Sequence, residues 1–233
     1  MNILFTAIQL FVLLFAITIH ETAHGWAAMK MGDLTAYSMG RVSLNPLAHI
    51  DPFGTILLPL ICVLIGAPAF GWAKPVPVNP FNLKNPRRDS LWISAAGPAS
   101  NILTAVAALC LIVFLKAVSP GVQLFFENLS TFQATRAGGS PAAGLSLVNG
   151  LALILFFAVL VNTYLAVFNL IPIPPLDGGG VLMGLLSPAA ASSYERIRPY
   201  GFLLVMGLIY LRVLDIIIQP ILSLIFTVIF IKL

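Results

Sequence analysis

The amino-acid sequence predicts an all-α polytopic membrane protein. We expect about five to six transmembrane helices and a small membrane-associated β-hairpin or re-entrant segment. Of the 233 residues, 59% are hydrophobic and only 9% are charged, whereas a soluble domain carries roughly 25% charged residues. Several apolar runs are long enough to cross a bilayer. The length fits a single domain over residues 1–233.

The first predicted span covers residues 3–29. Residues 3–19 carry no charge, and as a helix they rise about 26 Å, close to the ~30 Å of a hydrocarbon core. The segment lacks the basic start of a cleaved signal peptide, so we expect it to be retained. Lys30 and Arg41 follow it. Because cytoplasmic loops are rich in lysine and arginine, this end of the span is expected at the cytoplasmic face.

Residues 34–79 make up the predicted membrane-associated segment. Residues 34–44 have strand character, and the prolines in 73–79 predict an extended chain at a sheet edge. The apolar stretch 53–66 lies between them and is short for a span. We predict that it re-enters the membrane, since a crossing would place the basic cluster that follows outside the cell. That cluster consists of Lys74, Lys84, Arg87 and Arg88.

Three further segments complete the predicted bundle. Residues 91–118 form a span that crosses outward, and residues 150–177 begin as a span that crosses inward. The latter ends in three prolines before Asp177, so the backbone is expected to be extended or broken there. The connection 119–149 contains an apolar run that we expect on the membrane surface. Residues 200–231 predict a closing helical hairpin.

The first span ends in a metal-binding pattern, His20-Glu21-Thr22-Ala23-His24. On a helix, two residues four apart project only about 40° from one another, so both imidazoles can bind the same metal ion. Glu21 lies beside them, where its carboxylate can take a proton from a water. This is the H-E-x-x-H pattern of a zinc hydrolase. Ionisable groups are costly inside a membrane and indicate function there.

A catalytic zinc usually has three protein ligands and one open position. The two histidines supply two ligands, and His49, Asp51 and Asp177 are the candidates for the third. We favour Asp177, an acidic residue beside backbone-breaking prolines and glycines at membrane depth. A closed structural site is disfavoured, because such sites use four cysteine or histidine ligands. The sequence therefore predicts one catalytic Zn²⁺.

The chain resembles the site-2 protease family of intramembrane zinc metalloproteases. Three motifs carry the resemblance: His20-Glu21-Thr22-Ala23-His24, then Gly97-Pro98-Ala99-Ser100-Asn101, then Asn169-Leu170-Ile171-Pro172 running into Leu176-Asp177-Gly178. The resemblance implies that His20, His24 and Asp177 bind zinc and that Glu21 is the catalytic base. It implies cleavage of transmembrane helices near the cytoplasmic face. The chain resembles a compact member, because it carries no PDZ-like or nucleotide-sensing module.

The resemblance also implies partners and a location. We expect transmembrane proteins or peptides as substrates, in the lipid bilayer of a prokaryotic plasma membrane, with the active site toward the cytoplasm. The net charge of +4 is too small to indicate nucleic acid. Asn101 and Asn169 are candidates for binding substrate backbone or the oxyanion, or for bonding neighbouring helices. The oligomeric state is left open.

Two other classes of function compete with the protease. A metal transporter or metal sensor would use the same histidine and aspartate side chains, and a silent scaffold would escort membrane proteins. Glu21 distinguishes them, because a transporter has little need for a base that does not bind the metal. A scaffold would need neither the metal ligands nor the base.

Overall fold

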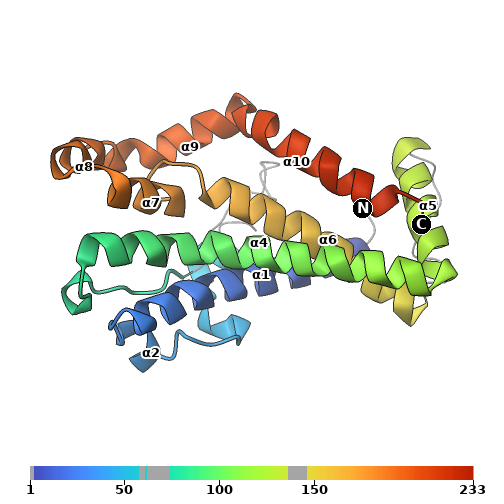
Figure 1. Cartoon of the computed structure of the whole chain (residues 1–233), viewed down its shortest axis with the longest axis horizontal. Coiled ribbons are helices and arrows are strands. Elements are labelled where there is room, and N and C mark those ends of the chain that lie inside the picture. Colours follow the sequence, from blue (N-terminus) through green and yellow to red (C-terminus); the bar gives the residue numbers. More distant parts are fainter. Residues whose placement is uncertain (1–2, 58–60, 62–73, 136–145, 233) are drawn as a thin grey trace. The chain divides into compact units, whose positions relative to one another are not determined.

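The computed structural model describes residues 3–57, 61, 74–135 and 146–232. The long elements are helices, and short 3₁₀ or π turns lie between them (Figure 1). The helices are α1 (Ile3–Lys30), α2 (Thr35–Ser38), α4 (Pro86–Val118), α5 (Pro120–Thr135), α6 (Leu147–Asn169), α7 (Asp177–Leu185), α8 (Pro188–Glu195), α9 (Gly201–Tyr210) and α10 (Val213–Phe230). The all-α prediction is confirmed for these residues.

Four helices in the described part of the chain are long and apolar enough to cross a membrane. They are α1 from Phe5, α4, α6 and α10. The predicted count of five to six is not supported. α9 is apolar but has only 10 residues, which span about 15 Å, or half of a hydrocarbon core. The region 200–231, predicted as a helical hairpin, contains α9 and α10, which meet at Leu211 and Arg212.

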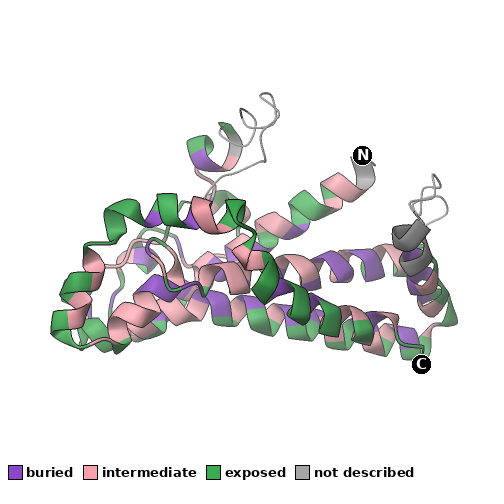
Figure 2. Ribbon diagram, turned by 90° about the horizontal axis from the view of Figure 1, so that it is seen from above, coloured by how far each residue is buried: buried purple, intermediate pink, exposed green. Residues whose placement is uncertain are grey.

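The surface of the spans is largely apolar. Only 22% of the α1 window and 17% of the α10 window are buried inside the protein. Large hydrophobic side chains lie on the exposed part, and exposed residues recur between buried ones along the helices (Figure 2). A soluble monomer rarely exposes so much apolar surface. A membrane environment accounts for it, because lipid covers these side chains.

The predicted β-hairpin is wrong for the residues that the structure describes: neither 34–44 nor 74–79 forms a strand. Residues 34–44 instead contain α2, and the chain closes on itself where the Arg41 N–H donates to the Ala36 carbonyl (2.9 Å). Gly40 makes this turn possible with a φ of 67°. Residues 52–57 form a π-helical turn, and most of the predicted re-entrant stretch 53–66 lies outside the described residues.

The chain divides into two compact units. The first comprises Met1–Leu13, Asn101–Phe168 and Leu203–Leu233, and the second comprises Leu14–Ser100 and Asn169–Phe202. The second unit contains the predicted metal ligands and is built on the C-terminal half of α1 and the first half of α4. A small core of Ala27, Ala28, Leu83 and Ile93 joins these parts. It holds the two helices that carry the first two motifs.

The first unit has a larger core, rich in phenylalanine. Val122, Phe125, Phe126 and Leu129 of α5 are all buried in it. We expected this apolar run on the membrane surface, but these four side chains pack inside the protein, whereas Leu124 of the same run is 57% exposed. Phe126 packs against Phe156 of α6 with ring centroids 6.2 Å apart. The run therefore serves to pack α5 within this unit.

The helix α4 begins earlier in the chain than the apolar span that the sequence predicts. We predicted a span from residue 91, but the helix begins at Pro86. Proline is favoured at the first helical position because its ring fixes φ and it has no N–H to satisfy. The carboxylate of Asp89 accepts a hydrogen bond from the Asn85 N–H (2.8 Å). Pro86 and the Asp89 carboxylate therefore allow the helix to begin before its apolar part, so that its first turn includes the charged residues Arg87 and Arg88.

Lys116 of α4 is buried in the first unit, with 3% of its surface exposed. Its ammonium donates to the carbonyls of Ile229 (2.7 Å) and Ile231 (2.5 Å) at the end of α10. These carbonyls belong to a helix end, where the backbone has no intrahelical donors. Lys116 therefore caps α10 from a neighbouring helix.

We predict that Lys116→Met lowers the free energy of unfolding by about 1–3 kcal/mol, because two carbonyls lose their charged donor. In detergent, the Tm should fall by several degrees. Lys232→Met is the matched control, since the exposed Lys232 pairs with Glu127 at 3.5 Å and such pairs contribute roughly 0–1 kcal/mol. Equal Tm values for the two variants would refute the capping role.

Candidate metal centre

His20 and His24 lie one turn apart on α1 and face the same way. Their side chains are buried, with 7% and 8% of each residue exposed. The two Nε2 atoms lie 3.1 Å apart. The rings are close to perpendicular, with centroids 4.7 Å apart. The helical spacing predicted this convergence from the sequence, and the structure confirms that the two imidazoles meet.

A backbone carbonyl from α4 fixes the orientation of His24. Nδ1 of His24 lies 2.7 Å from the carbonyl oxygen of Ile93. A carbonyl only accepts hydrogen bonds, so Nδ1 must carry the proton. In the neutral ring, Nε2 therefore carries a lone pair. This lone pair points toward His20 and Asp177 and is available to bind a metal. Metal-binding histidines are commonly held in this way by a carbonyl on their other nitrogen.

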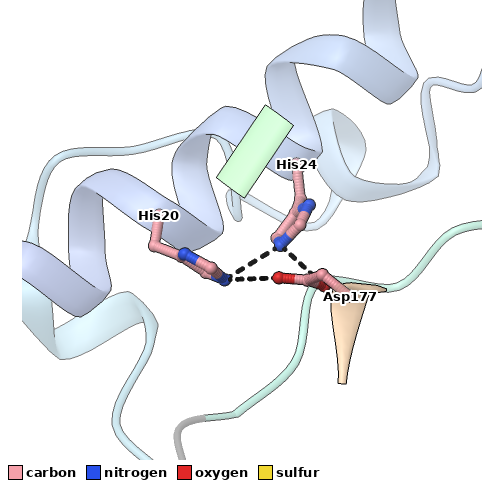
Figure 3. A group of neighbouring side chains, drawn as sticks. All are labelled: His20, His24 and Asp177. Carbon is pink, nitrogen blue, oxygen red and sulfur yellow. Dashed lines mark hydrogen bonds and ion pairs between the residues drawn. The ribbon is translucent and has the colours of Figure 1, made fainter. Parts of the chain in front are cut away.

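Asp177 brings a carboxylate to the two imidazoles (Figure 3). Its Oδ2 lies 3.0 Å from Nε2 of His20, and its Oδ1 lies 3.3 Å from Nε2 of His24. It is the first residue of α7, directly after the proline-rich stretch. The glycines that follow let this turn pack tightly. A Cβ on Gly178 would collide with the carbonyl of Leu170, and one on Gly180 with the side chain of Ser94.

The donor geometry fits one zinc ion. Ligand atoms at ~2.0–2.1 Å from a tetrahedral zinc are separated by about 3.3 Å. The two Nε2 atoms lie 3.1 Å apart, and each lies 3.0 or 3.3 Å from a different oxygen of the Asp177 carboxylate. Oδ2 of Asp177 is buried and accepts no hydrogen bond from the described residues, although His20 lies near it. A buried carboxylate oxygen of this kind is costly unless a cation binds it. The three side chains are close enough to bind a metal.

Gly97 of α4 lies against the edge of the two imidazoles that carries the donor nitrogen of His24. A Cβ built on Gly97 would collide with Nε2 of His24 and would lie 2.7 Å from Cε1 of His20. Only glycine therefore allows α4 to pass so close to the rings. The sequence shows Gly97 only as part of the second motif, and the structure shows that its neighbours are the metal-binding side chains.

Glu21 points to a different neighbour. Its Oε2 accepts a hydrogen bond from the backbone N–H of Val76 (3.1 Å). Val76 lies in the segment Lys74–Asn79, which the sequence had predicted to be extended. Glu21 is half-buried and is not one of the three residues whose donor atoms converge. Its role as the catalytic base stays a prediction.

The model of Peptidase family M50 matches residues 8–211 of this chain. The chain belongs to Peptidase family M50. It is 35% identical over 196 residues to "Putative zinc metalloprotease YwhC" of Bacillus subtilis, covering 84% of this chain and 77% of that protein. It is 29% identical over 197 residues to "Putative zinc metalloprotease Rip2" of Mycolicibacterium smegmatis, covering 84% of this chain and 64% of that one. No solved structure matches the chain.

Membership of M50 settles the class of activity: the protein is a zinc metalloprotease. The resemblance to site-2 proteases rested on motifs near residues 20–24, 97–101 and 169–178, and the match spans all three. The transporter and scaffold alternatives have no such support. The four apolar helices and the bacterial M50 relatives indicate a multi-pass membrane protein.

The other two ligand candidates lie elsewhere in this M50 protein. His49 is buried, and its Nε2 lies 2.9 Å from the carbonyl oxygen of Ser43 and 3.5 Å from the hydroxyl of Thr22. Asp51 accepts hydrogen bonds from the backbone N–H groups of Phe53 (3.1 Å) and Gly54 (2.7 Å). Both residues therefore stabilise the loop after α2, and neither joins the cluster of three donors.

The two asparagine candidates fall in different units. Asn101 is fully buried in the first unit, where its side-chain amide donates to the side-chain oxygen of Asn162 (2.7 Å). This bond joins α4 to α6, as expected of polar side chains within membrane helices. Asn169 is the last residue of α6 and belongs to the second unit with the donor cluster. The structure shows a helix-to-helix hydrogen bond for Asn101, and a substrate-binding role for either asparagine stays a prediction.

We predict that Gly97→Ala displaces the imidazoles and lowers the zinc content of the purified protein at least severalfold, with loss of proteolysis. The control is Gly150→Ala in α6, where a Cβ meets nothing within 4 Å. Zinc should be measured by atomic absorption after dialysis against dilute chelator. If Gly97→Ala retains as much zinc as Gly150→Ala, the close approach of α4 has no part in metal binding.

Proposed function

We propose that the protein is an intramembrane zinc endopeptidase that cleaves peptide bonds within or near transmembrane helices. The observation that carries this proposal is the position of the donor cluster. His20 and His24 lie on α1, a candidate membrane span, and Asp177 meets them at hydrogen-bond distances. Soluble metalloproteases have no need to place their metal ligands on such a helix, because ionisable groups are costly in lipid.

In this proposal His20, His24 and Asp177 bind the zinc ion. Bound zinc lowers the pKa of a water molecule toward ~7 and polarises the scissile carbonyl. Glu21 accepts the proton of the attacking water and delivers it to the leaving amine. Asn169 is the candidate for hydrogen bonding to the substrate near the reacting carbonyl. The Asn101 side chain is already bonded to Asn162, so we assign it to packing rather than to substrate binding.

A transmembrane substrate has to unwind before it can be cut, because a helix uses its amides in internal hydrogen bonds. Strand addition to the predicted extended segments 34–44 and 73–79 would be one way to hold an unwound substrate. The described parts of these segments do not form strands, and some of their backbone N–H groups donate within the protein, including Arg41 to Ala36 and Lys74 to His49. We therefore do not propose these segments as templates for the substrate.

We further propose that the donor cluster lies toward the cytoplasm of a bacterial plasma membrane. Lys30 ends α1, four residues after the exposed Trp26, whose ring lies 5.6 Å from the Lys30 ammonium. Tryptophan and lysine gather at membrane interfaces, and lysine favours the cytoplasmic side. The basic residues Lys84, Arg87 and Arg88 belong to the same unit as the cluster. Substrates are then cut close to that face.

We predict that Glu21→Gln abolishes proteolysis while the zinc content stays at the wild-type level, because glutamine cannot accept the water proton. The purified full-length protein should be incubated in liposomes with a panel of epitope-tagged single-span proteins, and products mapped by mass spectrometry. Glu195→Gln is the control, since Glu195 pairs with Arg198 (2.6 Å) in an exposed part of the chain. Cleavage by Glu21→Gln at the control's rate would exclude the proposed base.

The proposed orientation predicts the side of the membrane from which a cysteine at residue 84 can be labelled. We expect Lys84→Cys, at an exposed position, to react with an impermeant maleimide only after spheroplasts are permeabilised. Cys62 and Cys110 should first be replaced by serine so that no other thiol reacts. Labelling of Lys84→Cys in intact spheroplasts would reverse the topology and place the cluster toward the outside.

A further inference from the structure

The segment Lys74–Asn79 lies against the part of α1 that carries the H-E-x-x-H motif. The N–H of Val76 donates to Oε2 of Glu21 (3.1 Å). The Val76 side chain packs on Gly25, the residue after the motif, because a Cβ on Gly25 would lie 3.4 Å from Cγ1 of Val76. One backbone amide and one side chain thus hold this segment on the helix beside the expected base.

Both ends of the segment are anchored. At its start, the Lys74 N–H donates to the carbonyl of His49 (2.9 Å). At its end, the Asn79 N–H donates to Oδ2 of Asp33 (2.7 Å). Asp33 follows α1 by three residues, so it ties the end of the segment back to the helix that carries Glu21. The segment Lys74–Asn79 is therefore held by a hydrogen bond at each end, and Val76 lies between these two anchored residues.

The carboxylate of Asp33 is itself held in place by its surroundings. It is fully buried, and its Oδ1 accepts hydrogen bonds from the Thr35 hydroxyl (2.5 Å), the Thr35 N–H (3.1 Å) and the Asn82 side chain (2.8 Å). Burial by itself raises the pKa of a carboxyl group, but the hydrogen bonds from Thr35, Asn82 and Asn79 outweigh it and hold the pKa of Asp33 below its ordinary value. Asp33 is thus an anion at neutral pH.

The sequence of the segment suits a rigid support. Pro75 and Pro77 flank Val76, and proline fixes φ near −65° and has no N–H. In an extended chain, successive residues point their backbone groups to opposite edges. The edge that contains Val76 faces Glu21, and the opposite edge contains the two prolines, which cannot donate to a partner strand. The segment is therefore adapted to hold Val76 in place rather than to pair with another chain.

We propose that Asp33 is a positioning residue for proteolysis, which acts through the segment Lys74–Asn79 and the Val76 amide to orient the Glu21 carboxylate. This inference rests on the proposed function, in which Glu21 is the base. The Val76 N–H occupies Oε2 of Glu21, so Oε1 is the oxygen that takes the proton from the attacking water. Without the anchor, the carboxylate rotates out of line with that water.

The direct test compares Val76→Pro with Val76→Ala. The first variant removes the amide donor, and the second keeps the donor but shortens the side chain. We expect Val76→Pro to lower kcat by on the order of 10- to 100-fold, with KM and zinc content unchanged. Val76→Ala should stay within about twofold of wild type. The probe is the single-span protein that the wild type cleaves fastest in liposomes.

The second test keeps the proposal falsifiable if Val76→Pro fails to fold. Asp33→Asn preserves the size of the side chain but turns one accepting oxygen into an NH₂ group, which repels the N–H it faced. We expect kcat per zinc-loaded molecule to fall in the same range. In the double variant Asp33→Asn/Val76→Pro, the loss should be no larger than for Val76→Pro alone, because both changes break one connection.

Two results would overturn the inference. Wild-type kcat in zinc-loaded Val76→Pro would show that the amide does not orient Glu21. A lower Tm of Asp33→Asn with kcat per bound zinc unchanged would assign Asp33 to stability alone. The proposed function fails separately, since it requires that Glu21→Gln be inactive. An inactive Glu21→Gln beside a fully active Val76→Pro would retain the protease and remove only the role of Asp33.

Discussion

The structure depends on bringing a carboxylate at residue 177 to two imidazoles at residues 20 and 24. Their donor atoms lie 3.0–3.3 Å apart, which leaves room for one small cation and little else. Such crowding is unfavourable in an apolar setting unless the charges and lone pairs are matched. A divalent ion matches them, because one carboxylate and two neutral imidazoles supply three donors. The zinc chemistry of the family is therefore compatible with the membrane setting of this chain.

Close backbone approach makes the cluster possible. Gly97 lets α4 pass close to the donor edge of the imidazoles. Gly178 and Gly180 let the start of α7 pack against Leu170 and Ser94. The carbonyl of Ile93 then sets the tautomer of His24. In each case a main-chain atom or a missing side chain does the positioning. This is why glycines surround a site whose metal-binding side chains are histidine and aspartate.

The parts of the site that the sequence revealed are those set by side-chain identity and helical spacing. Two histidines four apart on one helix selected His20 and His24, and an acidic residue after a run of prolines favoured Asp177 over His49 and Asp51, a choice that the family resemblance also implied. The contacts from Ile93 and Val76 were not visible, because any residue offers a carbonyl and nearly any residue offers an N–H. Backbone groups leave no signature in a sequence, so their roles emerge only when the fold is known.

The errors in the fold have local causes. Residues 34–44 alternate as a strand does, but Asp33 accepts from the Thr35 N–H (3.1 Å), and such side-chain bonds to backbone favour turns over strands. The apolar run from Val122 to Leu129 was assigned to the membrane surface, yet all of its large apolar side chains except the exposed Leu124 pack in the phenylalanine-rich core of their own unit. Hydrophobicity alone does not distinguish a side chain that faces lipid from one that faces another helix.

X-ray absorption at the zinc edge of the full-length protein in detergent tests the central claim most directly. The account predicts a first coordination sphere of nitrogen and oxygen atoms at ~2.0–2.1 Å, with the outer scattering of two imidazoles. In Asp177→Ala, one oxygen should be lost or replaced by solvent while both imidazoles remain. A sulfur ligand at ~2.3 Å, or a spectrum that Asp177→Ala leaves unchanged, would contradict a centre built from His20, His24 and Asp177.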